Sequence, residues 1–241
     1  DAPAADVAAM AAPEASPRAV TFFQQPVPVP SYLLALAVGD LGSRNLSDRC
    51  RVWAEPSMVE AAAFEFSQVE DFLRAGEAVC GEYVWTRYDL LVLPPSFPYG
   101  GMENPNMTFV TPTLLAGDRS LANVVAHEIA HSWTGNLVTN QTWEHFWINE
   151  GCTVWVERKI LGRLGGDQAL QFHAARGALD LQNAVKHFGA GHNFTRLVPD
   201  LSGGKDPDDA FSRIPYEKGF YFLYHLQREA GGAAAFDPFF K

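Results

Sequence analysis

The stretch His127-Glu128-Ile129-Ala130-His131 constrains the fold and the chemistry of this chain more than any other. On an α-helix, two histidines four positions apart lie about 40° apart around the axis and one turn along it. Both imidazoles then face one side and can share a metal ion, while the glutamate between them can take a proton from a water molecule. The spacing therefore predicts a catalytic metal site on a helix.

The alternative for such a stretch is a pair of core histidines with satisfied hydrogen bonds. The surrounding helix is apolar almost all round, with Leu121, Val125 and Trp133 on one stripe and Ala126 and Ala130 beside it. A helix of this kind is buried, and its polar side chains need partners. A metal ion supplies one partner for both imidazoles, which favours the metal site.

A third ligand is available in the next helical segment. Glu150 follows His131 by 19 residues, and a turn around residues 136–142 would bring its helix back beside the first one. Catalytic zinc usually keeps three protein ligands, and two histidines with one glutamate are a known set. Glu157 lies seven residues further on nearly the same helical face. It can hold a ligating histidine in place or form a surface salt bridge, and the sequence leaves both readings open.

The composition limits the function classes. Of 241 residues, 47% are hydrophobic and 19% are charged, which excludes global disorder. The net charge of −10 argues against nucleic acid or an anionic membrane surface as the main partner. No uncharged apolar run reaches the roughly 18 residues that a membrane helix needs. Cys50, Cys80 and Cys152 are widely spaced without a CxxC motif, which predicts a reducing compartment and a cytoplasmic location.

The order of expected elements predicts an α+β fold, mostly helical with a small mixed sheet. Residues 1–19 are rich in Ala and Pro and are expected to form a loop. Strands are expected at 32–38, 51–54, 89–93 and 108–111, and helices at 58–80, 119–135, 144–162, 167–188 and 215–230. We expect residues 1–54 to end a β-rich domain and residues 55–241 to form the catalytic domain. The chain starts at Asp1 and ends in an apolar stretch, so we expect a piece of a longer protein.

Three motifs in order give the sequence a family resemblance. The His-Glu-x-x-His stretch followed by eighteen residues and Glu150 resembles the gluzincin zinc aminopeptidases. Residues 98–105, Pro-Tyr-Gly-Gly-Met-Glu-Asn-Pro, are similar to the GxMEN exopeptidase motif of that family. Residues 213–219, Arg-Ile-Pro-Tyr-Glu-Lys-Gly, are similar to its catalytic-tyrosine segment. Residues 131–147 place the closest similarity in the branch of leukotriene A4 hydrolase and aminopeptidase B.

The resemblance implies a thermolysin-like catalytic domain between a β-rich N-terminal domain and a C-terminal helical domain, the last missing from this chain. It implies one zinc ion on His127, His131 and Glu150, with Glu128 as general base and Tyr216 as oxyanion stabiliser. The implied substrate-binding residues are Glu103 for the free ammonium, together with Tyr99, Gly100, Gly101, Met102 and Asp208.

The expected function is removal of N-terminal residues from short peptides with a free N-terminus. A bifunctional enzyme that also opens a lipid epoxide is the first alternative. Asp208 favours it, and Phe211 weighs against it because the leukotriene hydrolase has a tyrosine there. A non-catalytic peptide-binding relative is disfavoured by the intact set of motif residues. An endopeptidase is disfavoured by Glu103, which would pair with the substrate ammonium.

Overall fold

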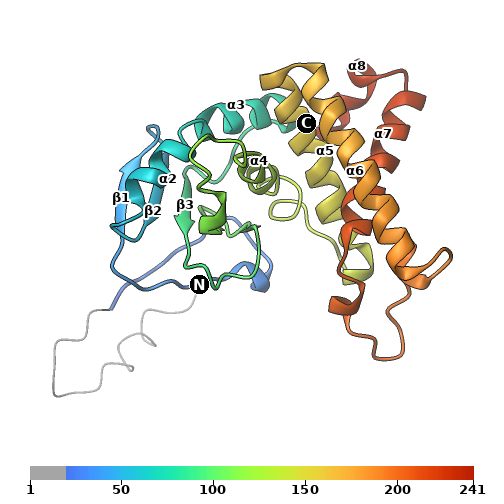
Figure 1. Ribbon diagram of the computed structural model, residues 1–241, viewed down its shortest axis with the longest axis horizontal. Coiled ribbons are helices and arrows are strands. Elements are labelled where there is room, and N and C mark those ends of the chain that lie inside the picture. Colours follow the sequence, from blue (N-terminus) through green and yellow to red (C-terminus); the bar gives the residue numbers. More distant parts are fainter. Residues whose placement is uncertain (1–19) are drawn as a thin grey trace.

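The computed structural model describes residues 20–241, in which one small mixed sheet is joined to a helical body (Figure 1). The five strands are β1 (Gly42–Asn45), β2 (Cys50–Ala54), β3 (Tyr88–Val92), β4 (Gly101–Met102) and β5 (Met107–Val110). Their order across the sheet is β1-β2-β3-β5-β4. The β2–β3 and β3–β5 pairs are parallel, and the two edge pairs are antiparallel. All five residues of β3 are buried, as expected for a central parallel strand.

The helical body carries most of the described chain. Its helices are α2 (Val59–Glu65), α3 (Val69–Cys80), α4 (Asn123–Ala130), α5 (Phe146–Gly165), α6 (Asp167–Phe188), α7 (Gly219–Glu229) and α8 (Ala233–Phe236). A π-helical turn, Ile214–Lys218, leads directly into α7. In Figure 1, α4 lies between the sheet on one side and α5, α6 and α7 on the other. The helix with the paired histidines is therefore held from both sides.

The burial of α4 follows from its apolar sequence. Val125, Ala126 and Ile129 are completely buried, as the pattern predicts. Helix α3 comes so close to the end of α4 that a Cβ atom on Gly76 would lie 2.8 Å from the Trp133 ring. Any side chain larger than hydrogen at this position would force the Trp133 ring to shift.

Several predicted elements are confirmed by the structure. The strands expected at 51–54, 89–93 and 108–111 match β2, β3 and β5 to within one residue. The helix expected at 167–188 coincides with α6, and the helix expected at 144–162 matches α5, which runs three residues further. The expected helix at 119–135 is shorter as α4, and the first part of the expected 215–230 helix is the π-helical turn.

The single helix expected at 58–80 is wrong, because the structure has two helices there. The helix is interrupted by a turn at residues 66–68, between α2 and α3. Phe66 at the break is only 2% exposed, and both helices bury apolar residues in the same core. The apolar spacing therefore continues across the break and hides it in the sequence.

The buried strand expected at 32–38 is also wrong. Ser31–Leu33 form a short 3-10 helix, and the following residues are extended but unpaired. Leu34, Leu36 and Val38 are 76%, 83% and 91% exposed. No strand of the described chain pairs with this segment, so Leu34, Leu36 and Val38 stay on the surface, whereas Leu33 is buried and Tyr32 packs on Trp143. The loop expected at residues 1–19 lies outside the described residues.

The sheet joins the two segments on either side of residue 54. β2 pairs with β3 in parallel, with Cys50 opposite Tyr88. The hairpin of β1 and β2 is therefore part of the same sheet as β3, β4 and β5. Among residues 20–241, every helix is too short or too polar to cross a bilayer.

Candidate metal and peptidase site

The two histidines and Glu150 meet between α4 and α5. The Nε2 atoms of His127 and His131 lie 3.3 Å and 3.4 Å from the same atom, Oε2 of Glu150. One donor atom from each residue lies within 4.8 Å of the other two. The expected return of the second helix beside the first is confirmed by this contact.

The opposite nitrogen of each imidazole is held by the protein. Nδ1 of His127 lies 3.0 Å from Oε2 of Glu157, whose side chain is 13% exposed. This contact with His127 argues against a surface salt bridge for Glu157 and agrees with the reading in which it orients the histidine. Nδ1 of His131 lies 2.9 Å from the Thr134 carbonyl oxygen, to which it can donate. A proton on each Nδ1 leaves each Nε2 free to bind a metal.

The three residues fit a metal ion by their chemistry as well as by their distances. Oε2 of Glu150 is buried without a hydrogen-bond partner, although the two imidazole Nε2 atoms face it. A buried carboxylate oxygen without a partner is costly, and a cation among these three atoms would remove that cost. Two imidazole nitrogens and one carboxylate oxygen are a donor set typical of catalytic zinc.

The charged groups of this cluster shift one another's pKa values. Burial opposes ionisation of Glu150, but the neighbouring imidazoles, His131 foremost, outweigh it and lower the pKa of Glu150 to about 2. Burial likewise disfavours a charged His131, yet the carboxylates of Glu103 and Glu150 raise its pKa to about 9. A metal ion binding here takes the place of protons on the imidazoles.

Glu128 lies beside this cluster and packs against the backbone of β4 at Gly101. Its side chain is 5% exposed, and burial raises its pKa to about 7 although the imidazoles act in the opposite direction. A Cβ atom on Gly101 would lie 2.3 Å from Oε1 of Glu128, so a larger residue there would displace the Glu128 carboxylate. Donor atoms of Glu103, Glu128 and His131 also lie within 4.8 Å of one another. The GxMEN segment is thus packed directly against the predicted base.

Tyr216 approaches from the π-helical turn before α7. Its ring stacks on His127, with 6.0 Å between ring centroids and 24° between the ring planes. Burial and the nearby carboxylates, Glu150 foremost, raise the pKa of Tyr216 well above its ordinary value. The hydroxyl therefore stays protonated near neutral pH and can donate a hydrogen bond.

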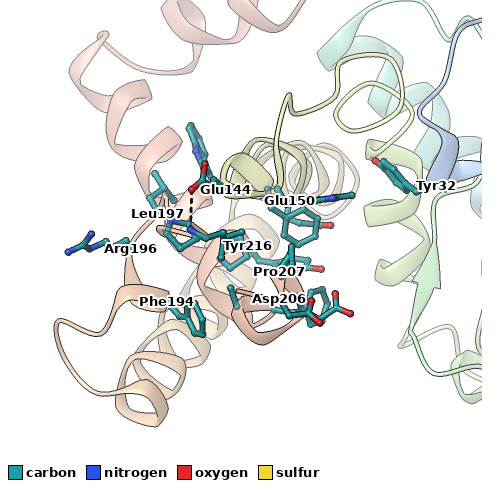
Figure 2. A pocket seen from close by; sticks show the side chains of 18 of the residues that line it. Tyr32, Glu144, Glu150, Phe194, Arg196, Leu197, Asp206, Pro207 and Tyr216 are labelled. Atoms are coloured by element: carbon teal, nitrogen blue, oxygen red, sulfur yellow. Dashed lines mark hydrogen bonds between the residues drawn. The ribbon is translucent and has the colours of Figure 1, made fainter. Parts of the chain in front are cut away.

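A cavity of about 570 Å³ reaches the site at Glu103, Glu150 and Tyr216 (Figure 2), and His127, Glu128 and His131 are not among its lining residues. Figure 2 shows Tyr32 on one side of the labelled residues and Phe194 and Arg196 on the other. The predicted site residues that line the cavity are Tyr99, Gly101, Met102, Glu103, Glu150, Asp208 and Tyr216. Gly100 is not among the lining residues, and its carbonyl oxygen accepts the Thr111 N–H at 3.0 Å, which ties β4 to β5.

Two residues at the site, Tyr32 and Asn136, were not predicted from the sequence. Tyr32, from the segment before β1, lines the cavity, and its hydroxyl accepts from Nδ2 of Asn149 at 3.2 Å. Nothing in the sequence around Tyr32 indicates this, since it lies far along the chain from the motifs. Nδ2 of Asn136 donates to the Glu103 carbonyl oxygen at 2.8 Å. Because Asn136 follows His131 by only five residues, a position near the site could have been predicted for it.

Comparison with known proteins agrees with the geometry. Residues 64–241 match the family described as the Peptidase family M1 domain. Leukotriene A-4 hydrolase of Xenopus laevis is 56% identical over 226 residues, which is 94% of this chain and 37% of that protein. Leucine aminopeptidase 2-1 of Meyerozyma guilliermondii is 53% identical over 219 residues, with 90% and 35% covered.

Among solved structures, yeast LTA4 hydrolase in complex with bestatin matches with a TM-score of 0.88 and 51% identity. That match covers 90% of this chain and 35% of the yeast chain. The chain spans about a third of the length of the relatives it matches.

Proposed function

The chain belongs to peptidase family M1, and from this premise we propose that its protein is a zinc-dependent aminopeptidase. The proposed reaction is hydrolysis of the N-terminal peptide bond of short peptides. One observation carries the proposal: the Nε2 atoms of His127 and His131 converge on Oε2 of Glu150 at the edge of a cavity. The chemistry of these three donors is what a catalytic zinc ion requires.

We assign the metal ligands to His127, His131 and Glu150, with Glu157 orienting His127. When bound, the zinc ion would supply Lewis acidity, which polarises the substrate carbonyl and makes a water molecule easier to deprotonate. The imidazoles are held by their Nδ1 atoms, so their Nε2 atoms need no rearrangement to bind it. A preorganised ligand set lowers the free-energy cost of binding.

Glu128 is the proposed general base. It is buried beside the metal ligands, where a carboxylate can accept a proton from the attacking water and later pass it to the leaving amine. Tyr216 then donates its hydroxyl proton in a hydrogen bond to the carbonyl oxygen as negative charge develops there. A donor of this kind is typically worth about 3 kcal/mol in the transition state.

Glu103 is the proposed anchor of the substrate ammonium. A fixed carboxylate at one end of the cavity sets the distance from the amino terminus to the scissile bond, which makes the enzyme an exopeptidase. The hydrogen bond from Asn136 to the Glu103 backbone supports this role because it holds the residue in place. Aromatic side chains around the cavity, including Tyr99 and Trp143, would receive the first substrate side chain.

A second candidate function is hydrolysis of a lipid epoxide in the same cavity. Asp208 lines the cavity rim, and a relative is named leukotriene A-4 hydrolase. Phe211 also lines the cavity, with its ring 6.1 Å from that of Tyr216, and it offers no hydroxyl to a lipid substrate. We therefore place the epoxide activity second.

We also propose a domain arrangement. Residues 55–241 would form most of a thermolysin-like catalytic domain, and the segment before them would end a β-rich domain. Because β1 and β2 share a sheet with β3, we move the expected boundary from residue 54 to a point before β1, so that the catalytic domain also includes β1 and β2 and only the segment before β1 belongs to the β-rich domain. The exposed apolar residues of 34–38 would pack against that β-rich domain.

A cytoplasmic location is proposed from the cysteines. Cys50, Cys80 and Cys152 are all free thiols in the described chain, and Cys50 and Cys80 are buried. Free thiols in the core are usual for proteins of reducing compartments.

The deciding experiment is an assay of the full-length protein on a panel of fluorogenic aminoacyl amides, with and without a zinc chelator. We expect chelator-sensitive cleavage of the free-amine substrates and none of N-acetylated controls. Glu103→Ala should abolish most cleavage and leave the zinc content intact. Cleavage of acetylated substrates, or activity that survives complete zinc removal, would refute the proposal. A lipid-epoxide assay on the same preparations tests the second candidate.

A further inference from the structure

Helix α5 and the π-helical turn that carries Tyr216 touch backbone to backbone. A Cβ atom on Gly151 would lie 2.7 Å from the Cα atom of Gly219, and one on Gly219 would lie 2.7 Å from the Cα of Gly151. Gly151 directly follows Glu150, and Gly219 is the first residue of α7, directly after the turn Ile214–Lys218. Any sliding of the turn along α5 would therefore change the distance between the Tyr216 hydroxyl and the metal ligands.

A buried ion pair joins the same two segments. Nη2 of Arg158, on α5, donates to both carboxylate oxygens of Glu217 at 2.8 Å. Both residues are buried, with 4% and 6% of their surface exposed. The guanidinium carbon also lies 4.0 Å from the centre of the Phe220 ring. The pair thus holds the turn at one position along α5.

Helix α6 closes over this pair. A Cβ atom on Gly177 would lie 2.0 Å from Oε2 of Glu217 and 2.3 Å from Nη2 of Arg158. The glycine lets the α6 backbone cover the charges and exclude water from them. Burying two charges is expensive, and an apolar pair of similar volume is often at least as stable. The pair is therefore poorly explained as a source of stability alone.

The sequence positions link this pair to the active site. Glu157, which holds His127, is the neighbour of Arg158, and Tyr216 is the neighbour of Glu217. Two neighbouring residues of α5 therefore make both contacts: Glu157 holds the proposed ligand His127, and Arg158 holds the turn that carries Tyr216. Resting on the proposed function, we propose that the Arg158–Glu217 pair is a positioning device that sets the Tyr216 hydroxyl relative to the metal site.

The test uses the full-length protein and a double-mutant cycle of Glu217→Gln and Tyr216→Phe. Gln has almost the same shape as Glu but cannot form the ion pair. In the wild-type background we expect Glu217→Gln to lower kcat by ~10- to 100-fold, the cost of small misplacement of a catalytic group. KM and zinc content should change by less than about twofold. In the Tyr216→Phe background the same change should have almost no effect, because no hydroxyl remains to be misplaced.

Two controls separate positioning from stability. Glu70, on α3, pairs with Arg49 and Arg74, far along the chain from the motifs, and Glu70→Gln should lower stability without changing kcat. Gly177→Ala keeps both charges but forces a methyl group against them. It should reproduce the kcat loss and its disappearance in the Tyr216→Phe background, even if Glu217→Gln does not fold.

Crystal structures provide a readout that does not depend on activity. The Tyr216 hydroxyl should be displaced relative to Glu150 in Glu217→Gln or Gly177→Ala when compared with the wild type. An unmoved hydroxyl, or an equal loss of kcat with and without the Tyr216 hydroxyl, would overturn the proposal. A wild-type protein without zinc-dependent cleavage would refute the proposed function instead, and the hydroxyl displacement would still decide the role of the pair.

Discussion

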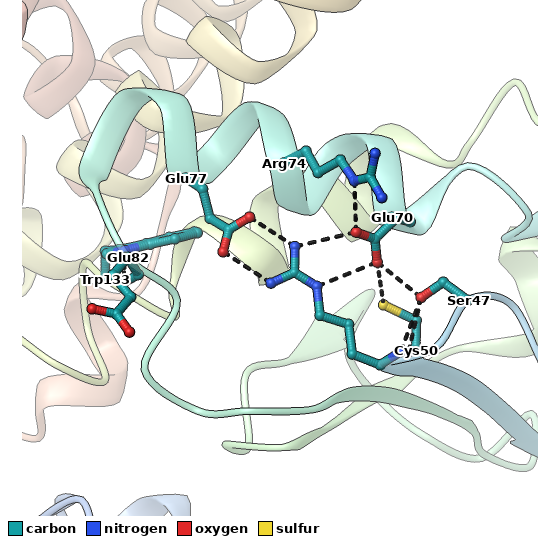
Figure 3. A network of polar contacts seen from close by, with 8 residues as sticks. Ser47, Cys50, Glu70, Arg74, Glu77, Glu82 and Trp133 are labelled. Atoms are coloured by element: carbon teal, nitrogen blue, oxygen red, sulfur yellow. Dashed lines mark hydrogen bonds and ion pairs between the residues drawn. The ribbon is translucent and has the colours of Figure 1, made fainter.

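Two clusters of charged side chains differ in one respect. Just before β2, Arg49 lies between Glu70 and Glu77, two carboxylates from α3 (Figure 3). Between α4 and α5, Glu150 lies between His127 and His131. In the first cluster a cation lies between two carboxylates, and in the second a carboxylate lies between two imidazoles. Only the first contains a permanent cation.

The Arg49 cluster is complete by itself. Its guanidinium donates to both oxygens of Glu77, at 2.9 Å and 2.7 Å, and to both oxygens of Glu70, at 3.3 Å and 3.2 Å. The side chains of Arg49, Glu70 and Glu77 are 27%, 17% and 29% exposed, so water also solvates them. Nothing in this arrangement asks for a ligand.

The Glu150 cluster is deeper and incomplete. The side chains of His131 and Glu150 are 2% and 7% exposed, and Oε2 of Glu150 has no hydrogen-bond partner. A cation bound by both imidazoles and the carboxylate would give that oxygen a partner. The comparison teaches that a buried donor cluster without its own cation points to a metal, whereas a cluster built around arginine is structural.

The largest expected effect comes from breaking the incomplete cluster. Glu150→Gln removes the anionic ligand but keeps the shape of the side chain. Zinc affinity should fall by more than the ~10–100-fold that loss of an outer partner costs, and peptidase activity should disappear with the metal. Metal content by mass spectrometry and activity on an aminoacyl amide measure both effects.

Glu70→Gln is the matched change in the complete cluster and should keep full zinc content. A chelator should lower the melting temperature of the wild type and of Glu70→Gln alike, because only the folded state binds the metal. It should not shift Glu150→Gln. Full zinc binding by Glu150→Gln would remove the distinction between the two clusters.

An intermediate effect is expected at the side chain that holds His127. Glu157→Gln keeps a hydrogen-bond acceptor near Nδ1 but removes the charge. Zinc affinity should fall by ~10–100-fold while the fold is kept. Competition with a chromophoric chelator gives the affinity, and circular dichroism checks the fold. Unchanged affinity would mean that Glu157 is only a packing residue.

The smallest effect is expected in the arginine cluster. Burial opposes ionisation of Glu70, but hydrogen bonds from Arg74, Arg49 and Ser47 outweigh it and lower its pKa to about 2. Since this lies below the roughly 4.3 of an unfolded glutamate, the stabilisation is present above about pH 4 and is lost as the pH falls towards 2. Glu70→Gln should therefore cost about 1 kcal/mol at pH 7, and less at lower pH.

Urea unfolding of the wild type and Glu70→Gln from pH 7 down to the lowest pH at which both fold measures this difference. A difference that grows on acidification would contradict the assigned pKa shift. Added salt should also reduce it, because the side chains are partly exposed.

Much of the candidate site was predictable from the sequence because its donors lie on regular helices. His127 and His131 share a face through the helical repeat alone, and Glu150 and Glu157 lie two turns apart on one helix. The break at Phe66 was not predictable, because apolar spacing continues through it. The unpaired segment 34–38 was missed because its composition is that of a strand, while its pairing depends on neighbours elsewhere in the chain.

The sequence by itself determined the metal-binding face of α4, because helix geometry is set by local hydrogen bonds and fixes the spacing of i and i+4 side chains. Tertiary structure alone decided that Glu157 reaches His127, that Tyr32 enters the cavity and that Arg158 meets Glu217. Glu157 and His127 are 30 positions apart in the chain, and Tyr32 is 117 positions from its hydrogen-bond partner Asn149. Their distances depend on how whole elements pack, and no local pattern of residues encodes that packing.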